Sequence, residues 1–175
     1  MKKRLLILSD LWGAKKSDWI TNYFNLLEVD FDITYYDCCE LGAVDKTVMT
    51  EEALHVQFIN HGITTAVEKL LKLELEEVNV LAFSIGGAIA WKAALNGLIV
   101  KNLYAISATR LRYEVEQPVC DIKLCYGADD FFIPSIEWFD KMTLQYNIID
   151  GVGHDLYFKK CFSISICDEI TRKCL

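Results

Sequence analysis

A serine, a histidine and a pair of aspartates lie where the pattern of this sequence predicts turns. Ser84 lies just ahead of a glycine pair, His154 lies in the glycine-rich segment 151–155, and Asp129 and Asp130 follow an apolar run. A serine hydroxyl is a poor nucleophile until a base removes its proton, and an imidazole does this best when a carboxylate fixes its tautomer. These residue types therefore predict an activated serine nucleophile.

The stretch around Ser84 predicts a strand, a sharp turn and a helix. Residues 78–83 form a continuous apolar run with β-branched and aromatic members, which is typical of a buried strand, and an alanine-rich helix is expected from about Gly86. Ser84 then lies at the reversal, and N–H groups at the start of the helix point at the same space. Because those groups favour negative charge, the turn suits a nucleophile whose attack generates an oxyanion.

His154 differs in context from the other two histidines. His55 and His61 fall within a long helical pattern, where a structural or solvent-facing role is expected. His154 instead follows a predicted strand, and its glycine-rich loop is able to bring an imidazole over the edge of a sheet. His154 is therefore the predicted base.

The elements that must position these residues alternate along the chain. Residues 37–46 are expected to form a loop. Six strands are predicted, over 4–9, 31–36, 78–83, 100–107, 121–126 and 144–149. Helices are predicted from a cap at Ser17 to about Leu27, over 51–73 with an interruption near His61 and Gly62, from about Gly86, from Pro134 to Met142, and within 155–174.

This alternation predicts an α/β fold in a single domain over residues 1–175. The expected architecture is a three-layer α/β/α sandwich with a mostly or wholly parallel sheet of about six strands. Ligands bind to such sheets at the carboxyl ends of the strands. The loops after Ser9, after Phe83 and after the late strands are therefore the expected site.

The segment Ala82-Phe83-Ser84-Ile85-Gly86 resembles the Gly-x-Ser-x-Gly nucleophile elbow of the α/β-hydrolase family, with Ala82 in place of the first glycine. The order serine, aspartate, histidine is also the family's order. Asp130 fits the family pattern better than Asp129, because Gly127 lies three residues before it and Pro134 four after. The resemblance extends from Arg4 to about Tyr157. It implies acyl transfer, in which Ser84 attacks a carbonyl, His154 takes the proton and Asp130 holds the imidazole.

The same resemblance implies an oxyanion hole made by two backbone N–H groups. The first belongs to Ile85, directly after the nucleophile. The segment Ser9-Asp10-Leu11-Trp12-Gly13 is similar to the family's His-Gly-x-Gly loop, although Asp10 and Leu11 replace the usual histidine and glycine. By this match the second donor is Trp12, with Leu11 as the alternative.

Many α/β hydrolases carry a helical cap between the fourth and fifth of the strands counted above. Here residues 108–117 are too few for a lid, so no cap domain and a shallow, open site are expected. Leu11, Thr109 and Arg110 are the expected contacts to substrate. The alternative for Thr109 and Arg110 is a solvated loop.

The resemblance implies a serine hydrolase of esterase or thioesterase type, which cleaves a small carboxylic ester or thioester through an acyl-enzyme and needs no metal or organic cofactor. Two alternatives stay open: a catalytically inactive hydrolase fold that serves as a binding module, and an acyltransferase that uses the same three residues. A nucleotide-binding domain is disfavoured, because the sequence has neither Gly-x-Gly-x-x-Gly after its first strand nor Gly-x-x-x-x-Gly-Lys.

Composition and charge disfavour several classes of binding partner. The net charge is −7 and no block of basic residues occurs, which disfavours nucleic acid. The basic start precedes only a short apolar segment, 5–8, and no run is long enough to span a bilayer, so neither a signal peptide nor a membrane partner is expected and the cytoplasm is the predicted location. The seven cysteines include no Cys-x-x-Cys pair, which disfavours a disulfide framework or a zinc site. Nothing in the sequence indicates the oligomeric state.

Overall fold

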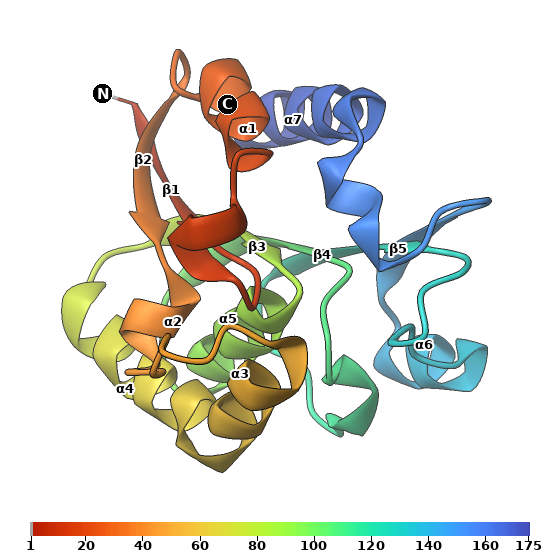
Figure 1. The fold of residues 1–175 in the computed structure, drawn as a ribbon. Helices are drawn as coiled ribbons and strands as arrows, with labels where there is room; N and C mark the ends of the chain where they lie inside the picture. Colours follow the sequence, from red (N-terminus) through yellow and green to blue (C-terminus); the bar gives the residue numbers. More distant parts are fainter. Residues whose placement is uncertain (1) are drawn as a thin grey trace.

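Six parallel strands form one sheet in the computed structural model, which describes residues 2–175 (Figure 1). The order across the sheet is β2-β1-β3-β4-β5-β6, so the direction of winding reverses between β1 and β3. Every neighbouring pair is parallel. The strands are β1 Lys3–Leu8, β2 Phe31–Tyr36, β3 Val78–Phe83, β4 Val100–Ile106, β5 Asp121–Gly127 and β6 Gln145–Ile149. The predicted α/β fold with a parallel sheet is confirmed.

The apolar runs form strands because both faces of the central sheet are buried. All six residues of β3 are buried. Along this strand the side chains alternate between two separate apolar clusters: Val80 and Ala82 belong to one, Leu81 and Phe83 to the other. This period of two is what a pleated strand imposes.

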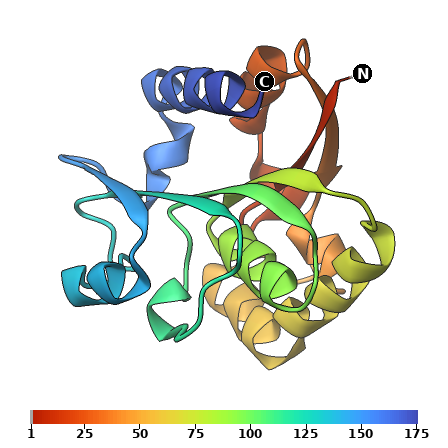
Figure 2. The same ribbon diagram turned by 180° about the vertical axis from the view of Figure 1, so that it is seen from behind.

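Helices cover both faces of the sheet, which gives three layers (Figures 1 and 2). Two helices pack over the cluster that contains Phe83, namely α1 Ile20–Leu27 and α7 Lys160–Cys174. The helices over the other face are α2 Cys38–Leu41, α3 Glu51–Gln57, α4 Ile63–Leu73, α5 Ile85–Leu95 and α6 Ile136–Met142. Within residues 2–175, no helix combines the length and apolar character needed to cross a membrane.

The long predicted helix over 51–73 is interrupted as expected. α3 is followed by a π-helical turn, Phe58–Gly62, and then by α4, so the chain stays helical but changes its winding at His61 and Gly62. The connection between β4 and β5 contains only a short 3-10 turn, Leu111–Tyr113. Within the described residues 2–175, no cap domain interrupts the fold.

Three local predictions were wrong, two of them in the chain before α3. Ser17 does not cap α1: its hydroxyl donates to the Ala14 carbonyl at 3.1 Å, within the 3-10 turn Gly13–Lys16, and α1 begins at Ile20. Residues 38–41 of the expected loop form α2, because the Asp37 carboxylate accepts from the Cys39 and Glu40 N–H groups.

The helix expected from Pro134 begins two residues later. Ser135 is its cap, and the Ser135 hydroxyl oxygen accepts from the Trp138 N–H at 3.3 Å. Proline lies just outside the first turn, where its missing N–H leaves the cap free to form.

Candidate active site

Ser84 lies on the turn between β3 and α5 with a φ of 50° and a ψ of −116°. This conformation is rare for a residue with a Cβ atom, and neighbouring elements hold it. The Ser84 N–H donates to the Ile106 carbonyl at 3.0 Å, and the Ser84 carbonyl accepts from the N–H groups of Gly87 and Thr109, both at 3.1 Å. The backbone of the predicted nucleophile is therefore tied to β4 and to the segment that follows it.

The turn is tight because Gly86 has no side chain. A Cβ atom at Gly86 would lie 2.5 Å from the Ser9 carbonyl oxygen and 3.0 Å from Leu8. Glycine thus lets the start of α5 pack directly against the end of β1. This packing brings the loop after β1 beside Ser84, at the point where the sheet reverses its winding.

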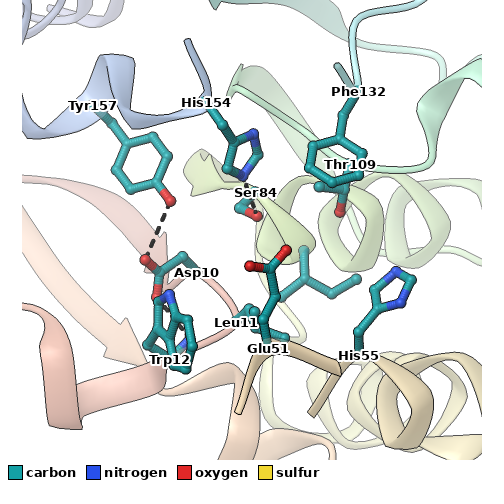
Figure 3. A pocket seen from close by; sticks show the side chains of 11 residues that line it. Asp10, Leu11, Trp12, Glu51, His55, Ser84, Thr109, Phe132, His154 and Tyr157 are labelled. Atoms are coloured by element: carbon teal, nitrogen blue, oxygen red, sulfur yellow. Dashed lines mark hydrogen bonds between the residues drawn. The ribbon is translucent and has the colours of Figure 1, made fainter. Parts of the chain in front are cut away.

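Ser84, His154 and Asp130 form a continuous hydrogen-bonded chain. The Ser84 Oγ lies 2.9 Å from His154 Nε2, and His154 Nδ1 lies 2.9 Å from Asp130 Oδ2 (Figure 3 shows the first of these bonds). A carboxylate only accepts, so Nδ1 carries the proton and donates to Asp130, which leaves Nε2 free to accept from the serine hydroxyl. The three residues that the sequence singled out are brought together in the order that nucleophile activation requires.

Asp130 is held in place from its other side. Its Oδ1 accepts from the Phe132 N–H at 2.9 Å, and the residue is 2% exposed. Asp129, the alternative, is exposed, and its N–H donates to the Val152 carbonyl at 3.0 Å. The structure therefore pairs Asp130, not Asp129, with His154.

The histidine loop reaches Asp130 because Gly127 lets two backbones approach. A Cβ atom at Gly127 would lie 2.1 Å from the Val152 carbonyl oxygen and 2.5 Å from that of Gly153. Aromatic rings then flank the imidazole: the His154 ring centroid lies 5.0 Å from that of Phe132 and 6.0 Å from that of Tyr157, both edge-on. The imidazole is thus oriented by packing as well as by hydrogen bonds.

Asp10 occupies the loop after β1 in a way that the sequence did not reveal. Its Oδ1 accepts from the Trp12 N–H at 2.9 Å, and its Oδ2 accepts from the Tyr157 hydroxyl at 3.2 Å. The side chain is buried, and this burial raises the pKa of the carboxyl from its ordinary value of 3.8 to about 6. The Trp12 N–H, the predicted oxyanion donor, is therefore already engaged, whereas the Leu11 N–H meets no acceptor within residues 2–175.

A cavity of about 80 Å³ opens over Ser84 (Figure 3). Of the residues predicted for the site, Asp130 and Arg110 do not line it. Asp130 reaches the site through its hydrogen bond to His154, and the Arg110 guanidinium lies 5.2 Å from the Tyr113 ring centroid. The other predicted residues at this cavity are Leu11, Trp12, Ser84, Ile85, Thr109 and His154. The lining residues that were not predicted are Asp10, Glu51, His55, Phe132 and Tyr157.

Glu51 and His55 come from α3, whose first turn forms one wall of the cavity (Figure 3). They lie four residues apart and so share one helix face. The helical pattern predicts that Glu51 and His55 share a face. It does not predict that the chain between α2 and α3 directs this face toward Ser84. Within the described residues 2–175, no cluster of three His, Cys, Asp or Glu side chains is arranged to hold a metal ion.

A scan against protein-family models and a search of curated proteins both found no match. Solved structures do share the architecture over nearly the whole chain. A predicted CIB-like hydrolase from Thermoplasma acidophilum superposes with a TM-score of 0.72 at 18% identity, over 98% of this chain and 87% of that chain. The chain has the α/β-hydrolase fold.

Two other α/β hydrolases are informative about the form of this fold. A serine hydrolase without lid from Xanthomonas campestris superposes with a TM-score of 0.65 at 12% identity, over 100% of this chain and 84% of that chain. Est1E from Butyrivibrio proteoclasticus, solved with ferulic acid bound, also gives 0.65 at 12% identity, over 99% of this chain and 88% of that chain. The match to a lidless member agrees with the short connection after β4.

Proposed function

We propose that this protein is a serine hydrolase that cleaves a small carboxylic ester or thioester through an acyl-enzyme. One observation carries the proposal: the unbroken chain from Ser84 Oγ through His154 to Asp130, with both hydrogen bonds at 2.9 Å. The positive φ of Ser84 adds to it, because it presents the hydroxyl at a helix start. Neighbours described as hydrolases support the same class.

In the proposed reaction, Ser84 Oγ attacks the substrate carbonyl carbon while its proton passes to His154 Nε2. Asp130 accepts from Nδ1 and stabilises the imidazolium that forms. The tetrahedral intermediate collapses as His154 returns the proton to the leaving alcohol or thiol, which leaves an acyl ester on Ser84. Water then attacks this ester with His154 again as the base, releasing the acid and restoring the serine hydroxyl.

The oxyanion is stabilised by N–H groups from two elements. Ile85 is the first residue of α5, where the N–H has no acceptor within the helix. The loop after β1 supplies the second donor. We assign it to Leu11, because the Trp12 N–H donates to Asp10. Removing one such donor typically slows turnover about 10² to 10³-fold.

The proposal is tested by the rate of hydrolysis of p-nitrophenyl acetate and of a short acyl thioester. The Ser84→Ala and His154→Ala variants should lose at least about 10³-fold in kcat, and Asp130→Asn should lose a comparable factor. Asp129→Asn and His61→Ala are the matched controls, since both residues are exposed and outside the cavity. Equal losses in Asp129→Asn and Asp130→Asn, or full activity in Ser84→Ala, would contradict the proposal.

A further inference from the structure

Thr109 presents a buried hydroxyl that has no hydrogen-bond partner within residues 2–175. The residue is 6% exposed, and it lines the cavity beside Ser84. Its N–H donates to the Ser84 carbonyl, so its position relative to the nucleophile is fixed. In Figure 3 the hydroxyl points into the cavity, on the side of Glu51 and His55. A buried polar group without a partner destabilises the protein, and a hydrogen bond from a bound ligand removes that cost.

The cavity continues beyond Ser84. The inner part, about 80 Å³, is small for a ligand site, since such sites typically measure about 300 to 1,000 Å³. An adjoining cavity of about 350 Å³ is lined by Glu51, Glu52, His55 and Phe132, three of which also line the inner part. The two cavities together form one groove, which runs from Ser84 past Thr109 to the first turn of α3.

Charge along this groove has one sign. Asp10, Glu51 and Glu52 are among the lining residues, and of residues 2–175 no lysine or arginine lines either cavity. Two cations contact lining residues without lining the cavities themselves. Arg112 donates to the Phe132 carbonyl at 3.1 Å and lies 5.5 Å from the Phe132 ring centroid, and Lys16 lies over the Trp12 ring at 3.7 Å.

The helix dipole alone explains why glutamates suit the first turn of α3. It does not explain the unpartnered Thr109 hydroxyl or the cavity between them. A ligand group that donates hydrogen bonds and carries positive charge fits the cavity, the Thr109 hydroxyl and the two glutamates together. A carboxylate or phosphate would meet only repulsion from Glu51 and Glu52.

We propose that this groove binds a protonated amine of the substrate, so that the hydrolysed compound is an ester or thioester bearing an ammonium group. The inference rests on the proposed hydrolase function. The ammonium N–H donates to Thr109 Oγ1, Glu51 and Glu52 supply the opposite charge, and the Phe132 ring borders the same space. Asp10 adds negative charge on the Ser84 side.

The test compares isosteric substrate pairs. On the leaving-group side, 2-(dimethylamino)ethyl thioacetate, protonated at neutral pH, is paired with neutral S-3-methylbutyl thioacetate. On the acyl side, the p-nitrophenyl ester of 4-(dimethylamino)butyrate is paired with that of 5-methylhexanoate. We expect the cationic member to be preferred about 10-fold or more in kcat/KM in at least one pair, and the preference to shrink with added salt. A ratio of 1 or below in both pairs overturns the proposal.

Variants then assign the preference to this groove. The double change Glu51→Gln with Glu52→Gln should bring the ratio close to 1. The control is Glu76→Gln with Glu77→Gln. It removes the same charge from two consecutive glutamates that do not line the groove, and it should keep the wild-type ratio. Thr109→Val should lower kcat/KM for the cationic substrate without lowering the stability of the fold, since the lost hydroxyl has no partner in the free protein. An equal ratio change in both double variants contradicts the assignment.

Binding separates this proposal from the hydrolase function. The Ser84→Ala variant is titrated with the same four compounds by calorimetry. Tighter binding of a cationic member supports the groove even if the wild-type protein hydrolyses nothing, a result that would refute the hydrolase function alone. If the protein hydrolyses the neutral esters but shows no preference for the cationic members in binding or turnover, only the amine-binding proposal is refuted.

Discussion

At the scale of single residues, the surrounding fold holds Ser84 in a backbone conformation that a residue with a Cβ atom disfavours. A side chain at a φ of 50° and a ψ of −116° costs of the order of 1 to 3 kcal/mol. Three backbone hydrogen bonds, to Ile106, Gly87 and Thr109, hold the residue there. The strain is thus maintained by the surrounding fold and keeps the hydroxyl exposed to the cavity.

A pair of substitutions at Ser84 tests this strain. Both Ser84→Ala and Ser84→Gly remove the hydroxyl, but only glycine removes the Cβ atom that makes the positive φ unfavourable. We expect Ser84→Gly to have a free energy of unfolding about 1 kcal/mol higher than Ser84→Ala in urea titrations. An alanine variant as stable as the glycine variant would show that the turn is not strained.

Asp10 couples the stability of the fold to pH. Burial raises its pKa from 3.8 to about 6, so the folded state favours the neutral carboxyl. The resulting stabilisation is complete below about pH 4 and is lost as the pH rises through about 6. The difference between 3.8 and about 6 corresponds to about 3 kcal/mol.

Asp10→Asn cannot ionise, yet its amide oxygen is able to accept from the Trp12 N–H as the carboxylate does. Relative to wild type, the variant should therefore gain up to about 3 kcal/mol in unfolding free energy between pH 4 and pH 7. Urea titrations at both pH values measure this gain, with Asp129→Asn as the exposed control. The same stability difference at both pH values would contradict the assigned pKa.

At the scale of elements, the position of His154 depends on how closely two loops approach one another. The loops after β5 and β6 touch because Gly127 has no side chain, and a Cβ atom there would lie 2.1 Å from a carbonyl oxygen of the histidine loop. Gly127→Ala should displace His154 and lower kcat/KM at least about 10-fold. Gly153→Ala, whose Cβ atom would meet nothing closer than 3.7 Å, is the matched control and should retain most activity. Comparable losses in both variants would contradict the argument.

The strands and the hydrogen-bonded trio were predictable from the sequence because each has a local signature. Continuous apolar runs specify buried strands, and Ser84 and Asp130 follow β3 and β5, whose last residues are buried. His154 follows the edge strand β6, which is not buried, and its signature is the glycine-rich segment 151–155. The helix α2 was not predictable, since four residues show no helical period and its cap depends on Asp37. Glu51, His55 and Asp10 were missed as site residues because their approach to Ser84 depends on packing between elements distant in sequence. Arg110 was expected at the site but faces Tyr113.

At the scale of the whole molecule, the strand order explains where the site lies. The reversal between β1 and β3 leaves a gap at their carboxyl ends, into which Ser84 and the loop from Asp10 to Trp12 both project. The short connection after β4 leaves this gap without a cap, and the first turn of α3 borders it instead. The topology, more than any single element, thus brings Ser84, Asp130 and His154 to one edge of the sheet.

The most direct measurement is the rate and position of labelling by a fluorophosphonate, with the adduct located by mass spectrometry. The hydrogen-bonded chain predicts a single adduct at Ser84, none in Ser84→Ala, and labelling slowed by at least about 10²-fold in His154→Ala but not in His61→Ala. Failure of the folded wild-type protein to label, or labelling at Ser84 that is as fast in His154→Ala, would contradict an activated serine.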